Sequence, residues 1–257
     1  MGQHFLADAT WQHRILDTLP RTPDETWIEI GAGHGELTHL LAAQGRRVVA
    51  IEADARLADG LQQRIRDNAA DWPGVELVAG DVLQLDLGKL VPGNFRVYGN
   101  LPYYITSPLL HHLFGYAGRI ASIHVVMQLE VAERIVARPG RREYAYLSAA
   151  CQFYTKPEIA LRIPPGAFRP PPRVRSALVS MTLPGEGAVL PVANEQKFLK
   201  FVQLCFGQKR KTLRNNLRSI APDRRIHDAL AACGLRPDAR AEQLLLSQFS
   251  ALFAALA

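Results

Sequence analysis

The sequence has few cysteines and no long apolar run, and these two absences exclude several classes of protein. Three of its 257 residues are cysteines. The odd number and wide spacing of Cys151, Cys205 and Cys233 fit neither a disulfide framework nor a metal site. The apolar runs are only a handful of residues long, far short of the ~20 needed to cross a bilayer. No secretory signal pattern occurs at the start. We therefore expect a cytoplasmic protein with reduced thiols, no membrane segment and no bound metal.

The sequence also lacks internal repeats and low-complexity tracts. Apolar residues make up 48% and charged residues 21%, which is typical of globular proteins and excludes a disordered chain. The net charge of +6 is unevenly distributed: residues 1–119 carry 10 basic and 14 acidic side chains, whereas residues 120–257 carry 20 and 10. This asymmetry indicates a small ligand in the front half and a polyanion, most simply nucleic acid, at the back half.

Short β-type segments alternate with helix-type segments over the first two thirds of the sequence. We expect strands at residues 26–30, 47–51, 75–79, 96–98, 122–127, 157–162 and 176–182. We expect helices at 9–19, 36–44, 56–68, 108–116, 130–137 and 145–154. This alternation predicts βαβ units and a parallel sheet covered by helices on both faces. Only a Pro-rich loop separates the last two strands, which predicts an antiparallel far edge.

The pattern changes at about residues 184–190, near Pro184-Gly185-Glu186-Gly187. From residue 194 onward every segment has helical periodicity, with helices expected at 194–205, 208–220, 225–233 and 241–256. We therefore predict an α/β fold with a Rossmann-like seven-stranded sheet and a small C-terminal all-helical domain. The sheet domain would comprise residues 1–186, and the helical domain residues 187–257.

A glycine-rich segment, Gly31-Ala32-Gly33-His34-Gly35, follows the first of these strands and precedes a helix. Glycine is required where the backbone approaches a ligand closely or adopts a positive φ. The spacing is G-x-G-x-G, the form associated with S-adenosylmethionine-dependent methyltransferases, rather than the G-x-G-x-x-G of dinucleotide-binding proteins. A simple strand–turn–helix junction is the alternative interpretation.

Acidic residues follow the next two strands. Glu52 ends the strand at 47–51, where a carboxylate can accept hydrogen bonds from ribose hydroxyls, and Asp81 follows the strand at 75–79, where it can accept from an adenine amino group. Either carboxylate alone is typical of a solvated loop. Open α/β sheets bind ligands at the carboxyl ends of their strands. Three successive strand ends therefore favour a cofactor site that includes Gly31, Gly33, Glu52 and Asp81.

The fourth strand is followed by Asn100-Leu101-Pro102-Tyr103-Tyr104. The exocyclic amine of adenine is a poor nucleophile, because its lone pair is delocalised into the ring. The side-chain oxygen of Asn100 and a backbone carbonyl at Leu101 or Pro102 can accept both N–H bonds and direct the lone pair at a methyl donor. Pro102 fixes the backbone, and Tyr103 offers a ring for base stacking, worth ~1–3 kcal/mol. The segment predicts methyl transfer by alignment, a structural turn being the alternative.

Together these segments resemble the KsgA (RsmA) family of ribosomal RNA small-subunit adenine N6-dimethyltransferases, along nearly the whole chain. The resemblance rests on residues 2–6 (GQHFL), the glycine motif, Glu52, Gly80-Asp81 and the segment 100–104. It rests most specifically on residues 168–174 (FRPPPRV) and 208–217 (QKRKTLRNNL). Two differences are that family members commonly have Asn at the position of His4 and a basic arm before the first motif.

The resemblance implies a methyltransferase catalytic domain at residues 1–186 and a helical RNA- or ribosome-binding domain at residues 187–257. It also implies a cofactor, a catalytic set and a substrate. S-adenosylmethionine would be contacted by His4, Leu6, Gly31, Glu52, Asp81 and Asn100. Asn100 and the backbone of residues 101–103 would present the target amine, with Tyr103 and Phe168 on either side of the base. The implied substrate is two adjacent adenosines, each dimethylated, in a hairpin near the 3′ end of small-subunit (16S) rRNA. The implied partner is the assembling 30S subunit, and we expect a monomer.

Three basic clusters in the second half of the sequence are candidates for RNA binding. They are the loop Arg138-Pro139-Gly140-Arg141-Arg142, the set Arg169, Arg173 and Arg175, and Lys209, Arg210, Lys211, Arg214 and Arg218. In the last set, i, i+4 spacing on the helix expected at 208–220 places Arg210, Arg214 and Arg218 on one face. We predict phosphate contacts from Arg141, Arg142, Arg173, Lys209, Arg210, Lys211 and Arg214, with salt-dependent affinity. A solvated charged face is the alternative.

Two other functions fit parts of this pattern. A large-subunit rRNA adenine methylase of the antibiotic-resistance (Erm) type, or a DNA adenine methylase, shares the motifs at the strand ends, but the segment 208–217 argues against both. In a ribosome-assembly or nucleic-acid-binding factor, methyl transfer would be incidental. The intact glycine motif, Glu52, Asp81 and Asn100 argue against loss of the chemistry, although a binding role can accompany catalysis.

Overall fold

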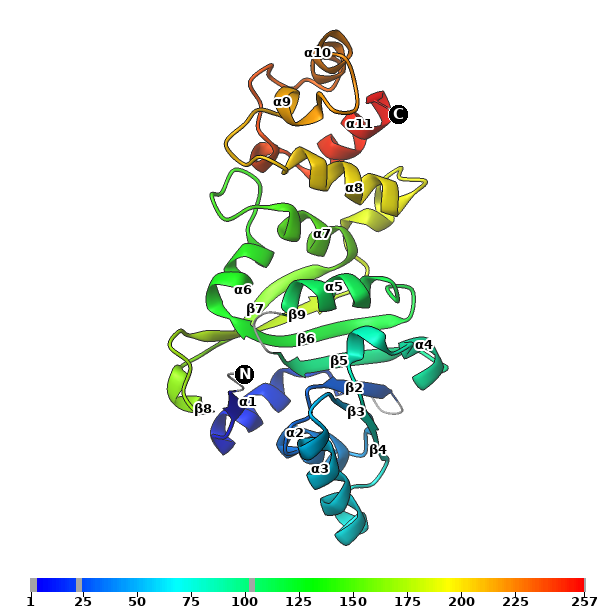
Figure 1. The fold of residues 1–257 in the computed structure, drawn as a ribbon, viewed down its shortest axis with the longest axis vertical. Helices are drawn as coiled ribbons and strands as arrows, with labels where there is room; N and C mark the ends of the chain where they lie inside the picture. Colours follow the sequence, from blue (N-terminus) through cyan, green and yellow to red (C-terminus); the bar gives the residue numbers. More distant parts are fainter. Residues whose placement is uncertain (1–3, 22–24, 102–104, 257) are drawn as a thin grey trace. The chain divides into compact units, whose positions relative to one another are not determined.

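A computed structural model of the chain describes residues 4–21, 25–101 and 105–256 (Figure 1). The chain divides into two compact units. The first comprises Met1–Ala132 and Pro157–Leu183, and the second comprises Glu133–Lys156 and Pro184–Ala257. The strands of the main sheet belong essentially to the first unit, and most of the second unit is helical.

The first unit is built around a sheet whose strand order, within the described residues, is β4-β3-β2-β5-β6-β9-β7. The strands are β2 (Thr26–Ile30), β3 (Arg47–Glu52), β4 (Val75–Ala79), β5 (Phe95–Asn100), β6 (Ile120–Gln128), β7 (Lys156–Ile163) and β9 (Ser176–Thr182). Strands β4, β3, β2, β5 and β6 pair in parallel, whereas β9 pairs antiparallel with β6. The seven-stranded α/β sheet and its antiparallel far side are thus confirmed.

Helices cover both faces of this sheet. They are α1 (Ala9–Thr18), α2 (Glu36–Ala43), α3 (Ala55–Asp67), α4 (Leu87–Leu90), α5 (Thr106–Phe114) and α6 (Leu129–Val136). Figure 1 shows α1, α2 and α3 on one side of the strands and α5 on the other. The central strands are therefore buried on both faces, and Trp27, Ile28 and Val49 have no exposed surface. Asp54 caps α3 by accepting from two backbone N–H groups of its first turn.

A second, two-stranded sheet joins the beginning and the end of the first unit. Strand β1 (Phe5–Leu6) pairs antiparallel with β8 (Phe168–Arg169), with Phe5 opposite Arg169 and Leu6 opposite Phe168. The pairing continues where the backbone N–H of Ala7 donates to the carbonyl of Ala167, at 3.0 Å. The sequence predicts neither strand, because two residues are too few to show the alternation by which a strand is detected.

The second unit consists of helices packed around one apolar core. Its helices are α7 (Tyr146–Tyr154), α8 (Glu195–Cys205), α9 (Leu213–Leu217), α10 (Asp223–Ala232) and α11 (Leu246–Leu256), together with the end of α6. Side chains of α7 share this core with those of α8, as the Phe153 and Phe198 rings show, with centroids 5.3 Å apart. The unit therefore includes residues 133–156, which the sequence assigns to the catalytic domain. The sequence shows that a helix has an apolar face, but it does not show which part of the protein packs against that face.

The segment that follows α8 differs from the single helix predicted at 208–220. Residues 207–212 form turns, and α9 covers only five residues. The Thr212 hydroxyl caps α9 by accepting from the Asn215 N–H at 3.4 Å. The Asn216 side chain donates to the carbonyls of Cys205 and Gln208, at 2.6 and 3.3 Å, and so stabilises the turns after α8. The prediction of one helix is wrong, and Arg210 lies in the turns before α9 rather than on one helix face with Arg214 and Arg218.

None of the helices in the described ranges is long and apolar enough to span a membrane. Cys151 and Cys205 are buried and Cys233 is half-buried, and all three are free. Burial raises the pKa of the Cys151 and Cys205 thiols, so both remain protonated.

Candidate active site

The carboxyl ends of four parallel strands meet at one edge of the first unit's sheet. After β2, the N–H of Gly31 donates to the carbonyl of Ile51 at 2.8 Å. After β4, the N–H of Gly80 donates to the carbonyl of Glu52, also at 2.8 Å. On the other side of β2, Ile30 lies opposite Gly99, the residue before Asn100. The sheet therefore brings together the glycine turn, Glu52, Asp81 and Asn100, as the parallel strand order predicts.

The first two glycines of the motif lie against other segments of this site. Gly31 has φ +75°, and a Cβ there would lie 3.4 Å from the backbone oxygen of Asn100. Gly33 has φ +59°, and a Cβ there would lie 3.2 Å from the ring of Phe5. Both positions therefore favour glycine for backbone conformation, and close space limits a side chain as well. The glycine turn therefore lies next to the backbone of Asn100 at this edge of the sheet.

The third glycine of the motif has a different neighbourhood. Gly35 has φ +84°, and a Cβ there would lie 2.5 Å from Leu61 Cδ1 and 2.9 Å from the Trp72 ring. Both neighbours belong to a small buried apolar cluster. Gly35 therefore allows close packing of the turn on this cluster.

Glu52 connects the glycine turn to the end of β3. Its side chain is 5% exposed. Oε2 accepts from the Gly33 N–H at 2.8 Å, and Oε1 accepts from the Asp54 N–H at 2.9 Å. A carboxylate can accept about four hydrogen bonds, so each oxygen keeps the capacity for one more. Glu52 thus fixes the shape of the turn and can still accept from a ligand hydroxyl.

Asp81 is exposed and begins the short 3-10 helix at Val82–Gln84. Its Oδ1 accepts from the Leu83 N–H at 3.0 Å, which fixes the direction of the side chain. No partner of Oδ2 occurs in the described part of the chain. The carboxylate therefore retains an acceptor oxygen at the strand end where the sequence predicts one.

Asn100 is the last residue of β5 and is half-buried. Its Nδ2 donates to the backbone carbonyl of His4 at 3.1 Å. A carbonyl oxygen only accepts, so the NH2 group of the amide must face His4, and Oδ1 is directed elsewhere. This orientation leaves Oδ1 as an acceptor, which is the role that the sequence predicts for Asn100.

The other predicted catalytic residues have different environments. Leu101 is 3% exposed, and its N–H donates to the Val126 carbonyl at 3.3 Å. Pro102 and Tyr103 lie outside the described residues, so their roles stay predictions. Phe168 is 1% exposed and packs in a core cluster that also contains Leu6. This ring lies in the core rather than at the surface, and its place beside a base stays a prediction.

The N-terminal segment contacts both Asn100 and the segment after β8. Besides receiving the Asn100 hydrogen bond, His4 places its Nδ1 at 2.6 Å from the carbonyl oxygen of Pro170. The Leu6 carbonyl accepts from the Gln12 side chain at 2.7 Å. Phe5, to which the sequence assigns no role, lies with its ring centroid 4.8 Å from that of His34 and so covers the glycine turn. The signal that points to Phe5 is its position inside the GQHFL motif.

Glu29, two residues before the glycine turn, is a further polar residue that the sequence reasoning missed. It is 2% exposed. Burial, helped by the charges of Glu36 and Glu52 and opposed by Thr38, raises the pKa of its carboxyl group to about 8. Glu29 is therefore mostly protonated at neutral pH. An acidic residue inside an otherwise apolar strand is the sequence signal that indicates this position.

The second unit brings two of the three basic clusters together. Arg141 and Arg142 are exposed, as are Lys209, Arg210 and Lys211. Nζ of Lys209 donates to the backbone carbonyl of Arg142 at 2.6 Å. The two segments therefore form one basic surface, which we call the 142/209 surface (Arg138, Arg141, Arg142, Lys209, Arg210 and Lys211).

The remaining two predicted RNA contacts have other surroundings. Arg214 lies 3.1 Å from a carboxylate oxygen of Asp223, and Arg218 lies 2.9 Å from the other oxygen. Hydrogen bonds from Arg218 and Arg214 lower the pKa of Asp223. The charge of Arg214 is thus partly balanced within the protein. Arg173 belongs to the first unit and is exposed in the loop between β8 and β9.

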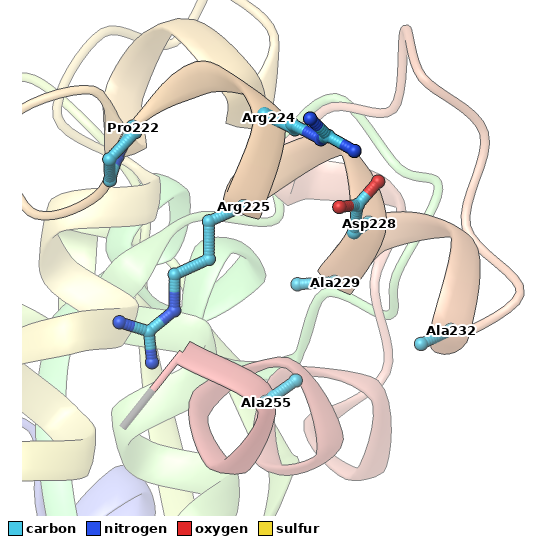
Figure 2. Close-up of a pocket in the computed structure, with 7 residues that line it drawn as sticks. All are labelled: Pro222, Arg224, Arg225, Asp228, Ala229, Ala232 and Ala255. Atoms are coloured by element: carbon cyan, nitrogen blue, oxygen red, sulfur yellow. The ribbon is translucent and has the colours of Figure 1, made fainter.

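No group of three or more His, Cys, Asp or Glu side chains that could hold a metal ion occurs in residues 4–21, 25–101 and 105–256. The second unit has a shallow cavity of about 490 Å³ between α10 and α11 (Figure 2). It is lined by Pro222, Arg224, Arg225, Asp228, Ala229, Ala232 and Ala255. None of these residues belongs to the predicted sites.

The chain is similar to known proteins along its whole length. The model of the family described as ribosomal RNA adenine dimethylase matches residues 1–257. The ribosomal RNA small subunit methyltransferase A of Koribacter versatilis is 38% identical, covering 98% of this chain and 92% of the relative. The protein of the same name from Acidobacterium capsulatum is 39% identical, covering 100% of this chain and 90% of the relative.

Two solved structures resemble the fold over almost the full length. A dimethyladenosine transferase from Plasmodium falciparum has a TM-score of 0.83 with 22% identity, covering 98% of this chain and 96% of that one. The 23S rRNA methyltransferase ErmE has a TM-score of 0.74 with 29% identity, covering 98% and 99%. Both comparisons extend over the sheet unit and the helical unit.

Proposed function

The chain belongs to the ribosomal RNA adenine dimethylase family, and from this membership we propose how its residues carry out the reaction. It is an S-adenosylmethionine-dependent rRNA adenine-N6,N6-dimethyltransferase that acts on small-subunit (16S) rRNA. The relatives named for the small subunit are 38% and 39% identical to it, whereas ErmE, named for 23S rRNA, is 29% identical. This difference favours the small-subunit substrate over the large-subunit alternative.

We propose that the substrate is a pair of adjacent adenosines in a hairpin near the 3′ end of 16S rRNA, and that the assembling 30S subunit presents it. We further propose that the enzyme acts in the cytoplasm as a monomer without a metal ion. The exposed basic residues of the second unit support an extended RNA partner, because phosphate contacts dominate affinity for nucleic acid.

The residues at the sheet edge fit S-adenosylmethionine, which is the cofactor. When bound, it supplies a methyl group attached to a positively charged sulfur. The turn at Gly31 leaves a space that a Cβ would fill, and Glu52 and Asp81 retain acceptor oxygens at adjacent strand ends. We assign cofactor contacts to His4, Leu6, Gly31, Gly33, Glu52, Asp81 and Asn100.

The observation that carries the proposed mechanism is the Asn100 amide held by the His4 carbonyl. With Nδ2 fixed there, in the first transfer Oδ1 accepts one N–H of the adenine amine, and the backbone carbonyl of Leu101 or Pro102 accepts the other. Two acceptors draw both hydrogens out of the plane favoured by conjugation, so the nitrogen lone pair becomes localised and nucleophilic. The proton leaves after the nitrogen has gained a methyl group, because alkylation makes it acidic. Alignment supplies most of the catalysis.

We propose that RNA phosphates contact the 142/209 surface, together with Arg173 and Arg214. The Lys209–Arg142 contact supports a shared role for the two segments, since it brings positive charges from positions 67 residues apart to one place. Arg214 would contribute less than the others, because Asp223 already balances part of its charge.

The experiment that tests the function incubates the enzyme with immature small subunits and labelled cofactor, followed by mass spectrometry of the nucleosides. We expect dimethyladenosine in 16S rRNA from the parental enzyme. We expect Asn100→Ala to abolish transfer while cofactor affinity stays within a few fold. Asn94→Ala, at the exposed residue just before the same strand, is the matched control and should retain activity. Parental rates for Asn100→Ala would refute the mechanism, and methylation confined to 23S rRNA would refute the substrate.

A further inference from the structure

The β1–β8 pair ends at a run of three prolines. In its register, Phe5 lies opposite Arg169 and Leu6 opposite Phe168. Residues 170–172 are all proline, and proline has no backbone N–H. The β8 side therefore offers no backbone donor from residues 170–172, and only their carbonyls can accept from the N-terminal segment.

The side chain of His4 supplies a contact at this point. Its Nδ1 lies 2.6 Å from the carbonyl oxygen of Pro170. A carbonyl oxygen only accepts, so Nδ1 must carry the hydrogen and donate it. An imidazole thus joins the N-terminal segment to the segment after β8, where the backbone offers no donor from the proline side.

The backbone of the same residue orients the catalytic amide. The His4 carbonyl accepts from Asn100 Nδ2 at 3.1 Å. If this carbonyl moved, the amide would lose the hydrogen bond that distinguishes its oxygen from its nitrogen, and a flipped amide would present NH2 where the target amine needs an acceptor. The position of the His4 backbone therefore determines whether Oδ1 of Asn100 can accept.

We propose that His4 is a positioning residue for methyl transfer, whose imidazole anchors its own carbonyl so that this carbonyl orients Asn100. The proposal rests on the proposed role of Asn100. It is distinct from the cofactor contact that the family resemblance implies for His4, because the effect passes through Asn100 and is felt in the transfer step. Misplacement of a reacting group by about 1 Å can reduce a rate about 100-fold.

Two substitutions at position 4 distinguish donor from acceptor with little change in size. In His4→Asn, the amide Nδ2 is bonded to Cγ as Nδ1 is in histidine, so the donor to Pro170 is kept. In His4→Asp, an oxygen occupies the same place and opposes the Pro170 carbonyl. His13→Asp is the matched control, because the His13 Nδ1 also contacts a backbone carbonyl, that of Ala9 at 2.8 Å, on the exposed side of α1.

The measurements are the single-turnover rate at saturating cofactor and the cofactor dissociation constant by calorimetry. We expect His4→Asp to lower the rate at saturating cofactor about 10- to 100-fold, in addition to any change in cofactor affinity. We expect His4→Asn to restore most of the rate and His13→Asp to leave it unchanged. If His4→Asp binds the cofactor, the variant is folded, and its lower rate is then not due to unfolding.

Three outcomes would overturn the proposal. They are a parental rate for His4→Asp, equal loss in His4→Asn and His4→Asp, and weakened cofactor binding with an unchanged rate at saturation. The last would make His4 a cofactor contact only. Failure of the proposed function itself is separate, because it would appear as a parental enzyme that forms no dimethyladenosine or as an active Asn100→Ala variant.

Discussion

Replacing Gly35 with alanine should destabilise the first unit while leaving the residues of the transfer site in place. Gly35 has φ +84°, a left-handed conformation that costs a residue with a Cβ about 1–2 kcal/mol. The added Cβ would also lie 2.5 Å from Leu61 Cδ1 and 2.9 Å from the Trp72 ring. These side chains are 1% and 6% exposed, so neither can move aside freely. Overpacking of this kind costs about 1–3 kcal/mol.

The total loss in the free energy of unfolding should therefore be about 2–5 kcal/mol for Gly35→Ala. Gly45 provides the matched control. It has φ +75°, but a Cβ there would have no atom within 4 Å. Gly45→Ala should cost only the conformational part, about 1–2 kcal/mol. The difference between the two variants isolates the packing contribution.

Urea denaturation followed by tryptophan fluorescence measures both losses in the free energy of unfolding. Trp72 lies beside Gly35 and so reports on the altered packing. Equal losses in the two variants would refute the packing argument. Parental stability of Gly35→Ala would refute the conformational argument as well. Under native conditions, the folded Gly35→Ala protein should bind the cofactor within a few fold of the parent, because the altered packing belongs to the apolar cluster.

Further predictions concern RNA binding, the glycine turn and the buried acid. Neutralising residues 209–211 together should make the salt dependence of RNA binding less steep. The slope of log affinity against log salt concentration should fall by about 0.9 for each phosphate that the variant no longer neutralises. An unchanged slope would indicate that these side chains are only solvated. In Glu52→Gln, one of two backbone donors, Gly33 N–H or Asp54 N–H, faces an NH2 group instead of an acceptor oxygen. An unpaired buried donor costs about 1–3 kcal/mol, so we expect calorimetry to show cofactor binding about tenfold weaker, and parental affinity would contradict this. Burial raises the pKa of Glu29 from its ordinary 4.5 to about 8, so the folded state binds a proton that the unfolded chain has released, and stability should fall as pH rises from about 4.5 through 8. Glu29→Gln should lack this decline and be more stable than the parent at pH 9; parallel urea midpoints across this pH range would contradict the assignment.

The main sheet could be predicted from the sequence because short runs of apolar β-type residues mark its strands. The predicted strands at 26–30, 75–79 and 176–182 coincide with β2, β4 and β9. Their bounds are marked by apolar β-type residues followed by glycine, proline or charged residues. Once the strands are parallel, their carboxyl ends must share one edge. The grouping of the glycine turn with Glu52, Asp81 and Asn100 therefore followed from topology alone.

Features that depend on contacts between distant segments could not be predicted in this way. The β1–β8 pair and the His4–Asn100 hydrogen bond join positions far apart in sequence, and neither produces a local periodicity. The burial of Phe168 is of the same kind, since an aromatic residue before prolines is equally compatible with a core or a surface. At 208–220, the helix is interrupted where the Thr212 side chain accepts a hydrogen bond and the Asn216 side chain donates one, and helix propensity reveals neither contact.

The discontinuous second unit has a consequence for any attempt to express the sheet unit alone. A polypeptide truncated after residue 186 would still carry residues 133–156, including Tyr144, Ala149 and Phe153, whose core partners come from residues beyond the cut. These apolar side chains would be exposed to water, and such a fragment would aggregate rather than fold as an independent enzyme. Separation of the two units would require excision of both chain stretches, so deletion from the C-terminus is not a way to ask what the sheet unit does by itself.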